Sequence, residues 1–315
     1  MGVRARTIAL GVGILLLGLV PPIAGAIDEP FYVDLLRRAM IFAIAALSLD
    51  LILGYGGLVS FGHAAYLGVG AYAVGILSFH GIDSGLIQWP VAMIASMLVA
   101  LVIGAVSLRT SGLYFIMITL AFTQMLYFFG ISIEAYGGDD GMPLLSRSQF
   151  GGHLDLYDPY VFYYVVMAVL LLFLLIGHRL VNARFGMVIR AVRLNEARLQ
   201  AIGFPTLRYK LTAFVIAGSM CGLAGALLAN QTEYLTPGFM HWTRSGEIMF
   251  MVILGGMGTL IGPVLGAIAF LLLEERLASY TEHWQIIFGP FLIVVVLFAK
   301  RGLLGLLSGG ATRGG

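Results

Sequence analysis

Two carboxylates stand inside apolar stretches of this 315-residue chain and are its first candidates for chemistry. Asp50 lies in LSLDLILGYGG and Glu247 in SGEIMFMVILGG, where burying a charge is costly, so each is a functional candidate by default. The alternative for Asp50 is a structural ion pair with Arg37 or Arg38. Glu247 could likewise pair with Arg244, and for both acids we favour structural support over direct contact with a ligand.

Three further polar residues need an explanation. Gln124 in LYFIMITLAFTQML could line a polar path or hydrogen-bond to a neighbouring helix. Ser60 and His63 could form a nucleophile and its base, but Ser60 directly precedes an apolar helical run, which favours a helix N-cap. The chain has no G-x-x-x-x-G-K-[ST] loop for ATP, and its six histidines lack metal-ligand spacing. We therefore predict no catalytic, cofactor or metal site on this chain.

The composition places these residues in a bilayer. The chain is 60% hydrophobic and 11% charged, with a mean hydropathy of +0.97. Soluble domains average about 25% charged residues. No linker or second composition regime divides the chain, so we expect one transmembrane domain over residues 1–315.

Apolar runs must position the candidate residues, and a spanning helix needs about 20 apolar residues. We expect such segments at 7–26, 33–53, 61–80, 86–108, 112–133, 159–178, 210–230, 246–274 and 283–299. The predicted fold class is an all-α polytopic membrane protein with about 8–10 transmembrane segments, some of them broken or re-entrant. Residues 1–26 also resemble a secretory signal with a small-residue cleavage site, but a retained helix is favoured.

Charge predicts the orientation of two loops. Residues 179–210 carry seven of the 18 Lys and Arg residues against Glu196 alone, which places this loop in the cytoplasm by the positive-inside rule. Residues 134–158 are acidic, with Arg147 as their single Lys or Arg, and are expected on the outside. Both chain termini are then expected in the cytoplasm.

Glycine interrupts the apolar segments in the same way in each half of the chain, at residues 54–71 and 255–267. Paired interruptions of this kind point to a translocation path. A single crossing by 246–274 would leave Lys300 and Arg301 outside, whereas two short pieces hinged near 255–262 remove that conflict. The candidates for the path or its helix breaks are Asp50, Gly54, Gly57, Ser60, His63, Gln124, Glu247, Gly255, Gly256, Gly258, Gly262 and Pro263.

A basic amphipathic helix is predicted within residues 184–204, where apolar residues recur near helical spacing and Gly203 helps to end the helix. Such a helix could lie on anionic lipid or dock into a groove of a soluble partner. Charge alone leaves both open.

Four motifs in chain order resemble the permease subunits of branched-chain amino-acid ABC importers. They are LDLILGYGGLVSFGHAAYLGVGAYA, GLYFIMITLAFTQM, RAVRLNEARLQAIGF followed by RYKLTAFVIAGSMCGLAGAL, and GEIMFMVILGGMGTLIGPVLGA. The long acidic loop and GLYFIMITLAF make the resemblance closer to the LivM-type than to the LivH-type subunit. It covers residues 35–299.

The resemblance implies a second permease subunit, two cytoplasmic ATPases that bind the ATP, an extracytoplasmic solute-binding protein, and a location in a bacterial or archaeal inner membrane. It also implies that the basic loop couples to the ATPase. The coupling candidates are Arg190, Arg193, Asn195, Glu196, Ala197 and Gly203. The family usually has asparagine where this chain has Asp50, which indicates a local salt bridge or a different solute.

Alternatives remain at this point. Urea, amides or aromatic acids are possible solutes within the same importer class. An ion-coupled secondary transporter would explain the broken helices and the acids but gives the basic loop no specific role. A membrane-bound scaffold or receptor leaves the broken segments unexplained.

Overall fold

A computed structural model describes residues 3–27, 29–151, 154–281, 283, 286–291, 293 and 302–307. The longer helices are α1 (Val3–Ile27), α2 (Phe31–Leu53), α3 (His63–Phe79), α4 (Gly85–Ser107), α5 (Leu113–Ser132), α6 (Pro159–Asn182), α7 (Arg184–Ala201), α8 (Thr206–Thr232), α9 (Trp242–Gly255) and α10 (Gly262–Ala278). The shorter elements are η1 (Glu134–Tyr136), β1 (Met142–Pro143), β2 (Tyr234–Leu235), η2 (Pro237–Met240) and α12 (Gly302–Leu307). The predicted all-α polytopic class is confirmed.

The helices follow the predicted apolar segments closely, including the division of 246–274 into α9 and α10. By length and hydropathy alone, four described helices could cross a membrane: α4, α5, α6 and α8. The 23-residue α2 has the length but carries four charged side chains. Of the predicted segment 283–299, residues 283, 286–291 and 293 are described, and Lys300 and Arg301 after it lie outside the described residues.

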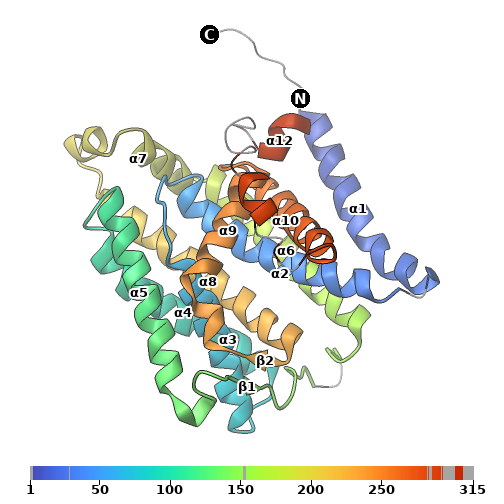
Figure 1. The fold of residues 1–315 in the computed structure, drawn as a ribbon. Coiled ribbons are helices and arrows are strands. Elements are labelled where there is room, and N and C mark those ends of the chain that lie inside the picture. Colours follow the sequence, from blue (N-terminus) through green and yellow to red (C-terminus); the bar gives the residue numbers. More distant parts are fainter. Residues whose placement is uncertain are drawn as a thin grey trace.

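Helix α8 lies at the centre of the bundle and packs against α2, α3 and α4 (Figure 1). Glycines allow this close approach. A Cβ on Gly222 would overlap Ser96 of α4, and a Cβ on Gly225 would overlap the Leu67 carbonyl of α3. Small residues let membrane helices approach closely enough for van der Waals packing to hold them together.

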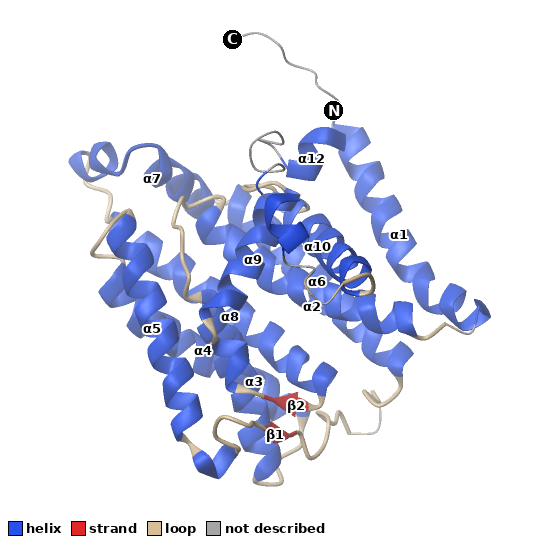
Figure 2. Cartoon of the chain, viewed as in Figure 1, coloured by secondary structure: helices blue, strands red, loops and turns tan. Residues whose placement is uncertain are grey.

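The two loops of opposite charge lie at opposite ends of the molecule. Helix α7 and the short α12 lie at one end, and the β1–β2 pair lies at the other (Figures 1 and 2). Strand β1 belongs to the acidic 134–158 loop and pairs antiparallel with β2, which follows α8. This arrangement fits the expectation that the basic and acidic loops face opposite sides of a membrane.

Candidate functional site

The first glycine break separates α2 from α3 and brings irregular backbone into the bundle. Helix α2 ends at Leu53, the chain turns through Gly57 at φ +70°, and α3 begins at His63. The intervening residues form neither helix nor strand. At membrane depth such backbone persists only where its polar groups find partners inside the protein or in a water-filled cavity.

Three hydroxyls supply those partners. The Phe61 N–H donates to Thr119 Oγ1 at 3.2 Å, and its carbonyl accepts from Thr123 Oγ1 at 2.9 Å and from Ser245 Oγ at 2.7 Å. Ser245 Oγ also accepts the Ala64 N–H at 2.9 Å. The backbone that enters α3 is therefore held between α5 and α9. None of these three residues was predicted from the sequence, although Thr119 and Thr123 are spaced four apart on one helix face.

Helices α3 and α9 begin beside each other. Ser245 in the first turn of α9 bonds to Ala64 in the first turn of α3, and the Phe61 and Trp242 rings lie 6.4 Å apart. At 1.5 Å per residue, the 14 residues of α9 are about 21 Å long, less than the roughly 30 Å hydrocarbon core. Two half-helices thus direct their positive dipole ends toward one region, where the start of α3 is buried and Trp242 at the start of α9 is exposed.

The second break is a tight hinge between packed helices. Helix α9 ends at Gly255 and α10 begins at Gly262 with Pro263 in its first turn, as predicted. Gly256 at φ +119° and Gly258 at φ +74° have backbone conformations that L side chains rarely adopt. Thr259 closes the turn, since its Oγ1 donates to the Gly256 carbonyl at 2.7 Å and accepts the Gly262 N–H at 3.2 Å.

Asp50 joins the two breaks. Its Oδ1 accepts the Gly258 N–H at 2.8 Å across 208 positions of sequence, and the side chain is fully buried. A Cβ on Gly54 would overlap both the Asp50 carboxylate and the Gly258 nitrogen, so the contact requires glycine at 54.

The partner expected for Asp50 is wrong, whereas the partner expected for Glu247 is confirmed. Arg37 pairs with Asp34 near the start of α2, and Arg38 lies 3.9 Å from Glu274 of α10. These arginines precede Asp50 by more than three helical turns on α2, so they cannot reach it. They pair instead with acids close to the start of α2. Glu247 Oε2 lies 2.7 Å from Arg244 Nη1.

The predicted basic helix forms as α7 but is divided in two. Asn195 has φ −162° and ψ 95°, and its side-chain oxygen accepts the Arg198 N–H at 3.0 Å, which caps the second piece. Before this kink, the Arg193 guanidinium donates to the Gly54 carbonyl in the first break. The candidate coupling residue Arg193 is therefore in contact with the first glycine break.

After the kink, Glu196 ties α7 to the start of α8. Its Oε1 lies 2.7 Å from Lys210 Nζ and accepts the Thr206 hydroxyl at 2.9 Å. Partial burial raises the pKa of Glu196, but the hydrogen bonds from Lys210 and Thr206 and the Lys210 charge outweigh it and leave the pKa below its ordinary value.

The remaining coupling candidates occupy the surface of this loop. Arg190 donates to the Gly186 and Val181 carbonyls at the α6–α7 turn. Ala197 is exposed, and Gly203 has φ +88° just after α7 ends.

Ser60, His63 and Gln124 lie apart from the Asp50 contact. The expectation that Ser60 is the N-cap is wrong: Gly62 precedes α3, and Ser60 Oγ accepts the Gly62 N–H at 3.1 Å. His63 is buried edge-on to Tyr66, at 5.5 Å between ring centroids. Gln124 is half-buried on α5, next to Thr123.

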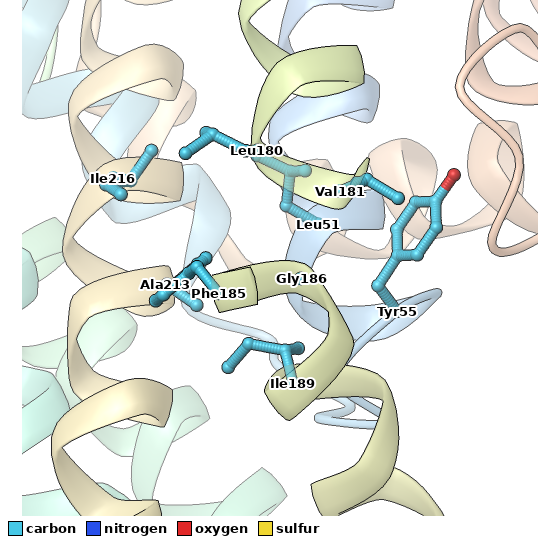
Figure 3. A pocket seen from close by; sticks show the side chains of 9 residues that line it. All are labelled: Leu51, Tyr55, Leu180, Val181, Phe185, Gly186, Ile189, Ala213 and Ile216. Atoms are coloured by element: carbon cyan, nitrogen blue, oxygen red, sulfur yellow. The ribbon is translucent and has the colours of Figure 1, made fainter. Parts of the chain in front are cut away.

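A small cavity lies beneath α7. Its volume is about 20 Å³, and Figure 3 shows its almost wholly apolar lining of Leu51, Tyr55, Leu180, Val181, Phe185, Gly186, Ile189, Ala213 and Ile216. Such a cavity has room for a water molecule but few polar groups to hold one. Among the described residues, no group of three or more His, Cys, Asp and Glu side chains is arranged to hold a metal ion.

Comparisons with known proteins agree with this architecture. The family described as the permease component of branched-chain amino acid transport systems matches residues 31–297. The LivM permease protein of the high-affinity branched-chain amino acid transport system of Salmonella typhimurium is 28% identical, over 86% of this chain and 69% of its own length. Its Escherichia coli counterpart is 27% identical over 90% and 73%, and a probable LivM protein of Methanocaldococcus jannaschii is 25% identical over 85% and 87%. No solved structure matches the chain.

Proposed function

Since this chain belongs to the family of branched-chain amino acid transport permeases, we propose that it is a LivM-type subunit that moves hydrophobic amino acids across the cytoplasmic membrane. It works with a second permease subunit, two ATPase subunits and an extracytoplasmic solute-binding protein. The chain itself binds no ATP and no cofactor, and its N- and C-termini lie in the cytoplasm. Urea, amides and aromatic acids remain second candidates as solutes.

The observation that carries this proposal is the surface of α7. Leu194 of α7 is 87% exposed, and Ile202 directly after α7 is 67% exposed. Both lie in the basic loop, at the end of the molecule opposite the acidic loop. A two-part helix with exposed apolar side chains and a basic surround suits a groove on a soluble partner. An ion-coupled transporter would need no such surface.

The adjacent starts of α3 and α9 support a translocation path beside them. Half-helix dipoles favour a carboxylate, and the nearby Phe61 and Trp242 rings favour an apolar side chain. Gln124 follows Thr123 on α5, and its Oε1 is buried without a hydrogen-bond partner among the described residues. Weak binding suits this role, because the binding protein selects the solute before it reaches the path.

Reconstitution tests the proposal. The chain is placed in liposomes with its second permease, the ATPases and the binding protein, and leucine uptake is measured with and without ATP. We expect uptake only with ATP and all subunits, and neither uptake nor ATP hydrolysis from the chain alone. Uptake driven by a sodium or proton gradient without the ATPases would contradict the proposal.

Docking through α7 is tested separately by pull-down of the ATPase. Leu194→Glu places a charge in the proposed apolar contact, so we expect at least about tenfold weaker capture, as for other central contact residues. Met187→Glu is the matched control, because Met187 is an exposed apolar residue on the first piece of α7. Equal capture by both variants would place the docking surface elsewhere.

A further inference from the structure

The Arg193 side chain of α7 contacts the first break in two ways. Its Nη1 donates to the Gly54 carbonyl. Its aliphatic stem lies over Gly57, where an added Cβ would come within 2.9 Å of Arg193 Cγ. A movement of α7 therefore acts directly on the backbone at the end of α2.

Asp50 carries the connection on to the second break. Its Oδ1 accepts the Gly258 N–H at 2.8 Å, while Oδ2 is buried and has no hydrogen-bond partner among the described residues. The α9–α10 hinge is thus bound to α2 through a buried side chain, one helical turn before the residue that Arg193 holds.

The two contacts lie close together. Arg193 Nη1, which donates to the Gly54 carbonyl, lies 3.9 Å from the position that a Cβ would take on Gly258, whose N–H Asp50 accepts. An amide at position 50 could still accept from Gly258, but it would have no charge to attract the guanidinium. The carboxylate thus adds a charge that can attract Arg193, which an asparagine of the same shape would lack.

We propose that Asp50 and Arg193, with the Gly54 carbonyl and the Gly258 N–H, form a latch through which α7 moves both glycine breaks together. Both side chains are positioning residues: they hold backbone segments, and neither need contact the solute. This inference rests on the proposed importer function, in which α7 receives the movement of the ATPases. With the latch broken, α7 can move while the breaks stay in place, so ATP is hydrolysed without solute crossing.

The test uses the complete reconstituted importer. Leucine uptake and binding-protein-stimulated ATP hydrolysis are measured for wild type, Asp50→Asn, Arg193→Gln and the double variant. We expect uptake per ATP to fall about tenfold in each single variant, and the double variant to be no worse than either, because interacting residues are not additive. Arg184→Gln is the matched control, since it removes an exposed arginine from the first residue of the same helix.

Two results would overturn the latch. One is an unchanged ratio of uptake to hydrolysis in the single variants, including a parallel fall in both rates. The other is a double variant whose loss is the product of the two single losses. If Asp50→Asn fails to assemble, Arg193→Gln alone tests the latch, because Arg193 is exposed. Failure of the proposed function is distinct, because the wild-type complex itself would then show no ATP-driven uptake.

Discussion

The two glycine breaks have similar compositions and different structures. The first carries irregular backbone into the bundle, where hydroxyls of α5 and α9 bind it. The second is a short hinge between α9 and α10, closed largely by its own Thr259. Glycine permits a break, and the neighbouring hydrogen-bond partners decide its shape. The first break therefore depends on distant parts of the chain, and the second depends mainly on itself.

The largest effect is expected where the two breaks meet. Gly54→Ala places a Cβ against the Asp50 carboxylate and the Gly258 nitrogen, so we expect a loss of about 1–3 kcal/mol, as for overpacking in a core. The measurement is thermal unfolding of the purified chain in detergent. Gly246→Ala is the control, because its Cβ would lie 3.9 Å from the nearest atom outside its own helix, on Phe61, and should change stability by no more than about 0.5 kcal/mol. Equal stability of the two variants would mean that the breaks do not touch.

An effect of equal or smaller size, and asymmetric between the two breaks, is expected from the hydroxyls. Ser245→Ala leaves the buried Ala64 N–H without its acceptor, at a cost of about 1–3 kcal/mol. Thr259→Ala removes a local contact at a half-buried turn, where water can replace it, and should cost less. Chemical denaturation of both variants measures the two losses of stability. A larger loss for Thr259→Ala than for Ser245→Ala would contradict the difference drawn between the two breaks.

The smallest effect lies outside the breaks, where Glu196 holds α7 to α8. Its pKa is lower in the folded protein than in the unfolded chain, so its contribution to stability is present above the unfolded value of about 4.3 and is lost as pH falls through the folded value. The Glu196 side chain is 34% exposed, so solvent screens the pair and its contribution to the free energy of unfolding is below about 1 kcal/mol. Melting temperatures at neutral and acidic pH test this: Glu196→Gln should differ from wild type at neutral pH only. A constant difference at all pH values would assign the effect to lost packing.

Much of the fold followed from local properties of the sequence. Hydropathy placed the helices, and the Gly262–Pro263 pair placed the start of α10, because both depend on neighbours in sequence. The partner of Asp50 did not follow, since the nearest arginines in sequence lie on α2 itself, whereas the Gly258 N–H that Asp50 accepts is 208 positions away. Ser245 and Thr119 were missed for the same reason: a hydroxyl in an apolar helix gives no sign of which backbone it will bind.

Amide hydrogen exchange tests most directly whether α7 and the two breaks form one unit. Exchange at residues 54–58 and 256–261 is compared between wild type, Asp50→Ala and Arg193→Gln, with Glu247→Gln as a control acid that has its own partner in Arg244. The latch predicts faster exchange than in wild type at both breaks in Asp50→Ala and Arg193→Gln, and unchanged exchange in Glu247→Gln. Faster exchange confined to one break, or unchanged exchange at Gly258 in Asp50→Ala, would contradict it.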